Sequence, residues 1–154
     1  MKIRKLLVLF LIPVTLFFVS CENEIPEEFQ IELSENMSMN GANLDSILEQ
    51  VDYFKLNLFK VFEYESVNGP TVGYSEVFFD LRLNKGDILR LDGLEPGLYE
   101  LTGNPYRINE YGEEEQSTYN VTRKSNKMAT LGYYEYIVVD EDSPTIVRLV
   151  ISPT

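Results

Sequence analysis

The chain has 154 residues, with 13 Lys and Arg against 25 Asp and Glu, and a formal net charge of −12. It has one cysteine and neither histidine nor tryptophan, which excludes Ser-His-Asp and Cys-His catalysis and imidazole acid–base chemistry at neutral pH. The acidic balance argues against a nucleic-acid partner, because binding phosphates requires a positive field.

The first twenty residues have the pattern of a secretory signal peptide. Three cations (Lys2, Arg4 and Lys5) precede an uncharged run from Leu6 to Val19, which is shorter than the roughly 18–20 residues of a membrane-spanning helix. The alternatives are an ordinary signal peptide followed by an incidental cysteine, and an uncleaved anchor.

The end of this segment, Phe18-Val19-Ser20-Cys21, resembles the lipobox of bacterial lipoproteins, with Phe18 at the position where leucine is usual. The resemblance implies cleavage before Cys21 and acylation of Cys21. It also implies a membrane partner, reached through the lipid anchor, and a place in the cell envelope, most naturally the outer membrane. Several acyl chains hold a protein far more firmly than one chain does.

Acylation would use the only thiol in the chain. The mature chain then forms no disulfide and no thiolate metal site, and we expect no cofactor. Without the three signal cations, 10 Lys and Arg stand against 25 Asp and Glu, and the mature charge becomes −15.

Residues 21–28 are expected to be an acidic, disordered tether between the lipid and one domain over residues 29–154. Acids directly after a lipid-bearing cysteine resemble the surface-export signal of Bacteroidetes lipoproteins. A plain spacer is the alternative, so the resemblance leaves open whether the domain faces the medium or the periplasm.

The mature domain begins with alternating residues and a short helical pattern. Phe29–Leu33 alternates with period two and predicts a strand. A short helical stripe follows, made of Leu44, Ile47, Leu48 and Val51, with Asn43 as its N-cap. Asp45-Ser46-Ile47 also fits a short Bacteroidetes O-glycosylation pattern.

From Asp52 onward the pattern predicts strands and turns. In Tyr53–Tyr64, the face with Phe54, Leu56, Leu58, Lys60 and Phe62 is expected to meet the core, and in Tyr74–Leu83 the residues on one face are Val77, Phe79, Leu81 and Leu83. Turns are predicted at Val67–Pro70, Asn84–Asp87 and Glu141–Pro144, and further strands at Ile88–Leu91, Leu98–Leu101, Leu131–Asp140 and Thr145–Ile151. This spacing predicts an all-β, antiparallel β-sandwich with one short N-terminal helix.

Residues 91–101 predict a strand, a turn and a second strand. Pro96 and Gly97 suit a type II turn, with Leu94 beneath it and Tyr99 and Leu101 on one face. The segment resembles the L-x-P-G-x-Y-x-L signature of prealbumin-like sandwiches, including Cna-B-type pilin domains and Bacteroidetes fimbrial-type lipoproteins. Some of those domains carry a Lys–Asn isopeptide crosslink. We expect none here, because Thr102-Gly103 replaces the supporting acid and Thr145–Ile151 lacks Asn and Asp.

Residues 103–128 are expected to form the longest irregular stretch, with a strand over Ser117–Arg123 as an internal alternative. Its ring and amide side chains suit recognition of sugar or protein. The candidate ligand-binding residues are Tyr106, Arg107, Tyr111 and Tyr119, beside Asn104, Asn109 and Asn120. The alternative is that these tyrosines pack locally.

Two acidic runs, Glu113–Glu115 and Asp140–Asp142, are the remaining candidates for chemistry. Neither has the EF-hand spacing, so calcium binding would need both runs together. A glycosidase would need two carboxylates at a set separation. We expect neither a metal site nor catalysis.

The sequence therefore predicts a non-enzymatic, lipid-anchored envelope protein with a structural, adhesive or ligand-binding role. The alternative is a carbohydrate-binding accessory protein of a glycan-uptake system. A carboxylate-dependent hydrolase is the weakest of the three hypotheses. The expected partners are the membrane and a glycan or an envelope protein.

Overall fold

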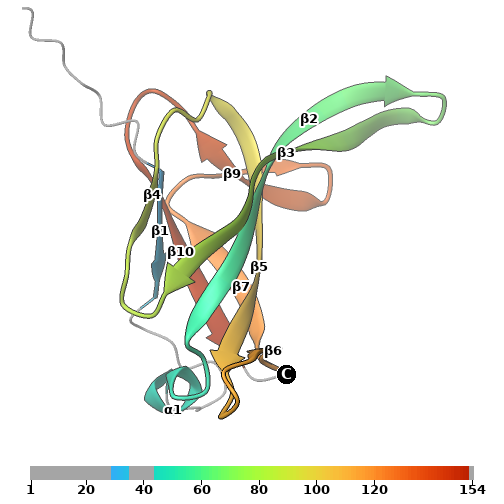
Figure 1. Ribbon diagram of the computed structural model, residues 1–154. Coiled ribbons are helices and arrows are strands. Elements are labelled where there is room, and N and C mark those ends of the chain that lie inside the picture. Colours follow the sequence, from blue (N-terminus) through green and yellow to red (C-terminus); the bar gives the residue numbers. More distant parts are fainter. Residues whose placement is uncertain (1–28, 35–43, 153–154) are drawn as a thin grey trace, which may run out of the picture.

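The computed structural model of the protein describes residues 29–34 and 44–152 (Figure 1). The predicted signal segment, Cys21, the tether and Asn43 lie outside these residues. Within the described residues, no helix has the length and hydropathy required to cross a membrane.

The described part contains ten strands and one short helix. They are β1 (Phe29–Leu33), α1 (Leu44–Leu48), β2 (Tyr53–Ser66), β3 (Gly69–Asn84), β4 (Leu89–Leu91), β5 (Gly97–Ile108), β6 (Glu114–Gln116), β7 (Asn120–Ser125), β8 (Met128–Leu131), β9 (Tyr134–Val139) and β10 (Thr145–Ser152).

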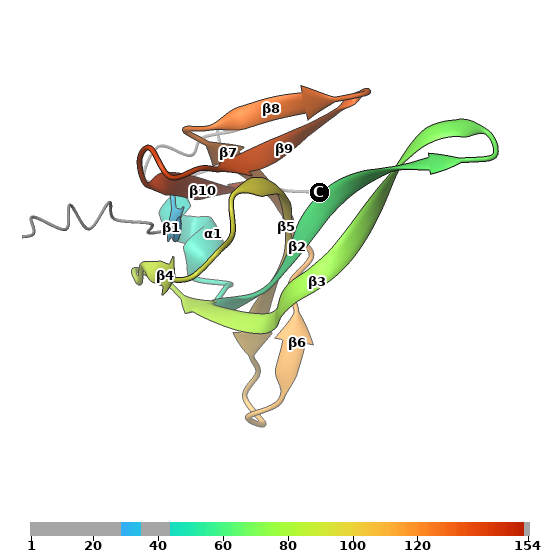
Figure 2. The same ribbon diagram turned by 90° about the horizontal axis from the view of Figure 1, so that it is seen from above.

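The strands form two sheets that pack as a sandwich (Figures 1 and 2). The smaller sheet has the order β4-β1-β10-β7. The larger has the order β3-β2-β5-β9-β8, with β6 also paired to β5. All pairings are antiparallel except that of β1 with β10. The predicted all-β sandwich is confirmed.

The core lies between the sheets and is made of the alternating apolar residues of both. Phe29 and Ile31 of β1 and Phe54, Leu56 and Leu58 of β2 are all 1% exposed or less. The short helix adds to the core, because Ile47 and the following Val51 belong to the same buried cluster. The first strand and the core-facing start of the second are therefore as predicted.

The predicted inward face of β2 is correct only as far as Leu58. Phe62 is 48% exposed, because β2 runs on past the end of its pairing with β5 at Val61↔Leu98. Val61, on the opposite face, is buried instead.

The predicted face of β3 is correct for Leu81 and Leu83 and wrong for Val77 and Phe79. Val77 and Phe79 are exposed, whereas Phe78, Leu81 and Leu83 pack on the core. The physical reason is two register shifts between β2 and β3, since each inserts one extra residue in β3 and moves the next side chains to the other face. Asp80 lies at this irregularity with φ +52°, and its N–H donates to the Asn57 side-chain oxygen at 3.0 Å.

The segment with the prealbumin-like signature forms β4, a connection and the start of β5. Leu94, Tyr99 and Leu101 are buried as expected, and the Tyr99 hydroxyl donates to the Glu95 carbonyl at 2.7 Å. The type II assignment is wrong, because φ of Gly97 is +155°, far from the roughly +80° of that turn position.

The expectation of a long irregular stretch over residues 103–128 is also wrong. β5 continues to Ile108, and β6 and β7 occupy much of the remainder. Most side chains in the end of β5, in β6 and in β7 are polar, and many of them are exposed. Their sequences therefore lack the alternation of apolar and polar residues by which a strand is recognised.

Candidate ligand-binding site

Two β-hairpins extend from the sandwich on one side (Figure 2). The first is the outer part of β2 and β3. β2 pairs with β5 only up to Val61, so residues 62–73 form a two-stranded arm beyond the core. The second is the β8–β9 hairpin, which turns at Gly132 and Tyr133.

An open groove lies between the arm and the β8–β9 hairpin. Its volume is about 650 Å³, and four of its residues are tyrosines; we call it the tyrosine notch. The residues that line it are Glu63, Pro70, Thr71, Val72, Tyr74, Leu131, Gly132, Tyr133, Tyr134 and Tyr136.

The base of the notch is fixed by a contact between two tyrosines. The hydroxyls of Tyr74 and Tyr136 lie 3.1 Å apart, and Tyr136 is 1% exposed. The hydrogen bond with Tyr136, then burial, then the Glu100 carboxylate raise the pKa of Tyr74 far above its ordinary value. The two tyrosines of this pair come from β3 and β9, and Tyr74 is held as a neutral hydrogen-bonding group.

The walls of the notch present exposed aromatic rings to solvent. Tyr133 is 101% exposed and Tyr134 is 68% exposed, and Tyr74 is half-exposed on the other side. These exposed rings on two neighbouring hairpins make the notch a candidate binding surface. A tyrosine ring offers an apolar face for stacking and a hydroxyl for hydrogen bonding.

Arg123 of β7 holds the β8–β9 hairpin against β5. Its guanidinium donates to the carbonyls of Leu101 (3.2 Å) and Glu135 (3.3 Å), and it lies 3.8 Å from the Glu100 carboxylate. These contacts join both sheets at one edge of the sandwich. They therefore determine where one wall of the notch stands relative to the other.

The four residues predicted for ligand binding lie elsewhere, toward the β6 end of the sandwich. Tyr106 stacks on the buried Tyr53, with ring centroids 5.6 Å apart. Tyr119 packs against the core, and Arg107 donates to Glu115 at 2.7 Å. Of the four, only Tyr111 is a free-standing ring, at 80% exposure.

Arg107 and Tyr111 do border a separate polar cleft of about 490 Å³. Two carboxylates of its lining already accept hydrogen bonds from the protein: Asp52 from the Ile108 N–H at 2.6 Å, and Glu115 from Arg107 and Asn109. The candidate residues thus form no single tyrosine-lined surface, and ligand binding in this cleft stays a prediction.

The two acidic runs lie at different ends of the sandwich, Glu113–Glu115 at β6 and Asp140–Asp142 in the β9–β10 connection (Figure 1). Calcium binding by both runs together is therefore wrong. Within the described ranges, no group of three or more His, Cys, Asp or Glu side chains is placed to hold a metal ion.

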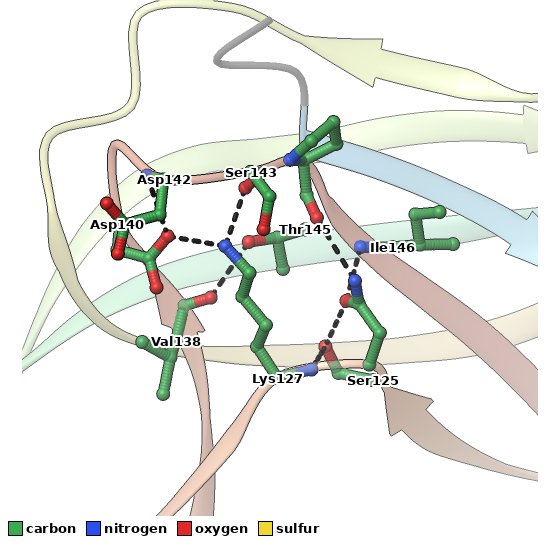
Figure 3. A network of polar contacts seen from close by, with 10 residues as sticks. Ser125, Lys127, Val138, Asp140, Asp142, Ser143, Thr145 and Ile146 are labelled. Carbon is green, nitrogen blue, oxygen red and sulfur yellow. Dashed lines mark hydrogen bonds and ion pairs between the residues drawn. The ribbon is translucent and has the colours of Figure 1, made fainter. Parts of the chain in front are cut away.

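The β9–β10 run instead belongs to a clasp between two connections (Figure 3). Lys127 Nζ donates to Asp140 and, at 2.6 Å, to the Ser143 carbonyl. Asn126 donates to the Pro144 carbonyl at 3.1 Å and accepts from the Ile146 N–H at 2.8 Å. The hydrogen bond from Lys127, as the largest cause, lowers the pKa of Asp140.

The sequence reasoning missed the notch because its walls come from segments more than fifty residues apart. One signal was present: aromatic residues continue past the length of strand that a sandwich can cover, at Phe62, Tyr64 and Tyr74. A second was the exposed pair Tyr133-Tyr134 directly after Gly132. Neither signal says that the two segments meet.

Comparison of the chain with protein-family models, with curated proteins and with solved structures found no match.

Proposed function

We propose that this chain is a lipid-anchored β-sandwich of the bacterial envelope that works by binding, and that the tyrosine notch is its binding site. The observation that carries the proposal is the set of exposed tyrosine rings on two hairpins that face one another across an open groove. Such a groove suits a partner that lies across the surface, and its lining supplies no histidine or cysteine for covalent chemistry.

The direction of the notch agrees with an N-terminal anchor. Phe29 begins β1 on the side of the sandwich opposite the arm (Figures 1 and 2). The eight residue steps from Cys21 to Phe29 span at most about 28 Å. A lipid on Cys21 would therefore attach the domain through its β1 side, and the notch lies on the side opposite this attachment.

A carbohydrate ligand is the second candidate, and the open row of rings favours it. Tyrosine faces stack on sugar rings, and tyrosine hydroxyls bond to sugar hydroxyls. This candidate now involves Tyr133 and Tyr134 in place of Tyr106 and Tyr111.

The test measures binding of the full-length chain, purified in detergent, to glycan arrays and to envelope fractions of the source bacterium. We expect Tyr134→Ala to weaken binding about fivefold, since one aromatic contact of this kind contributes about 1 kcal/mol. Tyr111→Ala is the matched control, because it removes an exposed tyrosine from the far end of the sandwich. Equal losses in both variants, or binding that survives Tyr134→Ala unchanged, would remove the notch as the binding site.

A further inference from the structure

We infer that the partner in the tyrosine notch is a basic, extended segment of another protein, whose lysine or arginine side chains lie on the tyrosine rings. This inference rests on the proposed function and names the class of ligand. Three observations support it: the charge of the two hairpins, the chemistry of the rings and the openness of the groove.

The two hairpins that form the notch carry charge of one sign. Residues 62–73 of the arm contain Glu63 and Glu65, and residues 128–139 of the β8–β9 hairpin contain Glu135. Neither segment contains a lysine or an arginine. The two hairpins therefore carry three acids and no base, and Glu63 lies in the lining of the groove. A cationic ligand is attracted to this field, and phosphates, nucleic acids and acidic glycans are repelled.

The rings add a second attraction of the same sign. The face of a tyrosine ring is electronegative, so a lysine ammonium or an arginine guanidinium binds over it. The chain already uses this contact elsewhere: Arg82 lies 3.7 Å from the Tyr53 ring centroid, and Lys55 lies 4.8 Å from that of Tyr106. The rings of Tyr133 and Tyr134 are exposed and able to accept such a contact from outside.

The shape of the groove favours a polypeptide over a small amine. The notch is open and about 650 Å³ in volume, whereas a small ammonium ion is held by rings that enclose it. β3, which supplies Pro70 to Val72 and Tyr74, is also an edge strand of its sheet. An edge strand offers backbone hydrogen bonds to an extended segment laid beside it.

The occupant is not part of this chain or a second copy of it. The segment that follows Cys21 contains four acids and no base within residues 21–28. A second copy has a net negative charge of its own, and like charges across an interface cost affinity.

The test uses the full-length chain in detergent and a short labelled peptide of alternating lysine and threonine. In two control peptides, each lysine is replaced by acetyl-lysine, which has a similar shape without the charge, or by glutamate. We expect the lysine peptide to bind and the control peptides not to, and we expect added salt to weaken binding. Glu63→Gln and Tyr134→Ala should each weaken binding about three- to tenfold, as the loss of one charge or one cation–π contact does.

Two controls separate the notch from the general acidity of the surface. Glu113→Gln removes an exposed acid at the β6 end, and Tyr111→Ala removes an exposed ring there. Both should bind the lysine peptide as the wild type does. The four substituted residues are all exposed, so thermal melts should be the same for all variants.

Three results would overturn the inference. They are equal binding of the acetylated peptide, equal weakening in the β6-end controls, and binding of a neutral glycan in the notch without binding of the lysine peptide. The last result would leave the proposed function standing, provided that Tyr134→Ala still weakens binding of that glycan. If no ligand binds more weakly to Tyr134→Ala than to the wild type, both the inference and the proposed function are contradicted.

Discussion

A Cβ atom added at Gly103 would meet a buried neighbour, whereas one added at Gly73 would meet an exposed neighbour. A Cβ on Gly103 would lie 2.4 Å from Leu56 Cδ2 and 3.3 Å from the Lys55 carbonyl oxygen. A Cβ on Gly73 would lie 2.5 Å from Phe62 Cε2. Leu56 is fully buried, whereas Phe62 is 48% exposed on the arm, so only the second neighbour has space to move.

We therefore expect Gly103→Ala to reduce the free energy of unfolding by about 1–3 kcal/mol, as overpacking of a filled core does. Gly73→Ala should change it by less than about 1 kcal/mol, because the exposed Phe62 ring rotates away. Urea unfolding of the two variants checks this. A Gly73→Ala variant as unstable as Gly103→Ala would show that the arm is packed as tightly as the core.

At the scale of elements, Arg123 connects β7 of one sheet to β5 and β9 of the other. Its side chain is 22% exposed, and its Nε is buried without a hydrogen-bond partner in the described residues. Arg123→Met should lower the free energy of unfolding by about 2 kcal/mol, because the Leu101 and Glu135 carbonyls lose a charged donor. Chemical denaturation measures this value.

The same substitution should loosen the β8–β9 hairpin in particular. Backbone amides of residues 128–137 should then exchange with solvent faster than those of β1 and β10, as measured by hydrogen exchange. Uniform acceleration across both sheets would contradict the role of Arg123 in positioning one wall of the notch.

The Lys127–Asp140 clasp predicts a specific dependence on pH. The pKa of Asp140 is lowered in the folded state, chiefly by the hydrogen bond from Lys127. A carboxyl group with a lowered folded-state pKa stabilises the fold above its unfolded-state pKa, and this stabilisation is lost as the pH falls through the folded-state pKa. Asp140→Asn should therefore lose less stability on acidification than the wild type.

The control for the clasp is Glu141→Gln, which changes an exposed neighbour of Asp140. Its acid unfolding curve should follow the wild type. If Asp140→Asn and the wild type lose stability in parallel, the clasp contributes nothing to the acid response. The other acids with lowered pKa, Glu95, Glu114 and Glu115, would then account for it.

The elements that the sequence predicts best are those with one apolar face and a marked turn. β1, the start of β2 and β10 alternate cleanly and are found where expected. β3 shows the limit of this reasoning, because two bulges reverse its alternation without any glycine at the site. Phe79 is therefore exposed while Leu81 and Leu83 pack on the core, although the alternation predicts one face for all three.

The candidate site could not be predicted from the sequence, for a different reason. The predicted residues Tyr106 and Tyr119 were sensible by type, but their rings serve stacking and core packing. The notch depends on which two hairpins face one another, and that depends on the order of strands in the larger sheet. A strand order is a long-range property that local patterns do not contain.

At the scale of the whole molecule, the proposed anchor predicts a simple dependence on Cys21. Cells that express the full chain should incorporate labelled palmitate into it, and the label should disappear in Cys21→Ser. The variant should also leave the membrane fraction, because several acyl chains supply the attachment. A Cys21→Ser protein that stays in the membrane fraction would point to an uncleaved anchor.

The most direct test of binding at the notch by an envelope protein is photocrosslinking in intact cells. A photoreactive phenylalanine analogue replaces either Tyr133, which is fully exposed at the notch, or Tyr111, which is 80% exposed at the far end. We predict a light-dependent adduct in the membrane fraction from position 133 and little from position 111. Equal adducts from both positions, or an adduct from position 111 alone, would contradict the assignment of the tyrosine notch as the binding site.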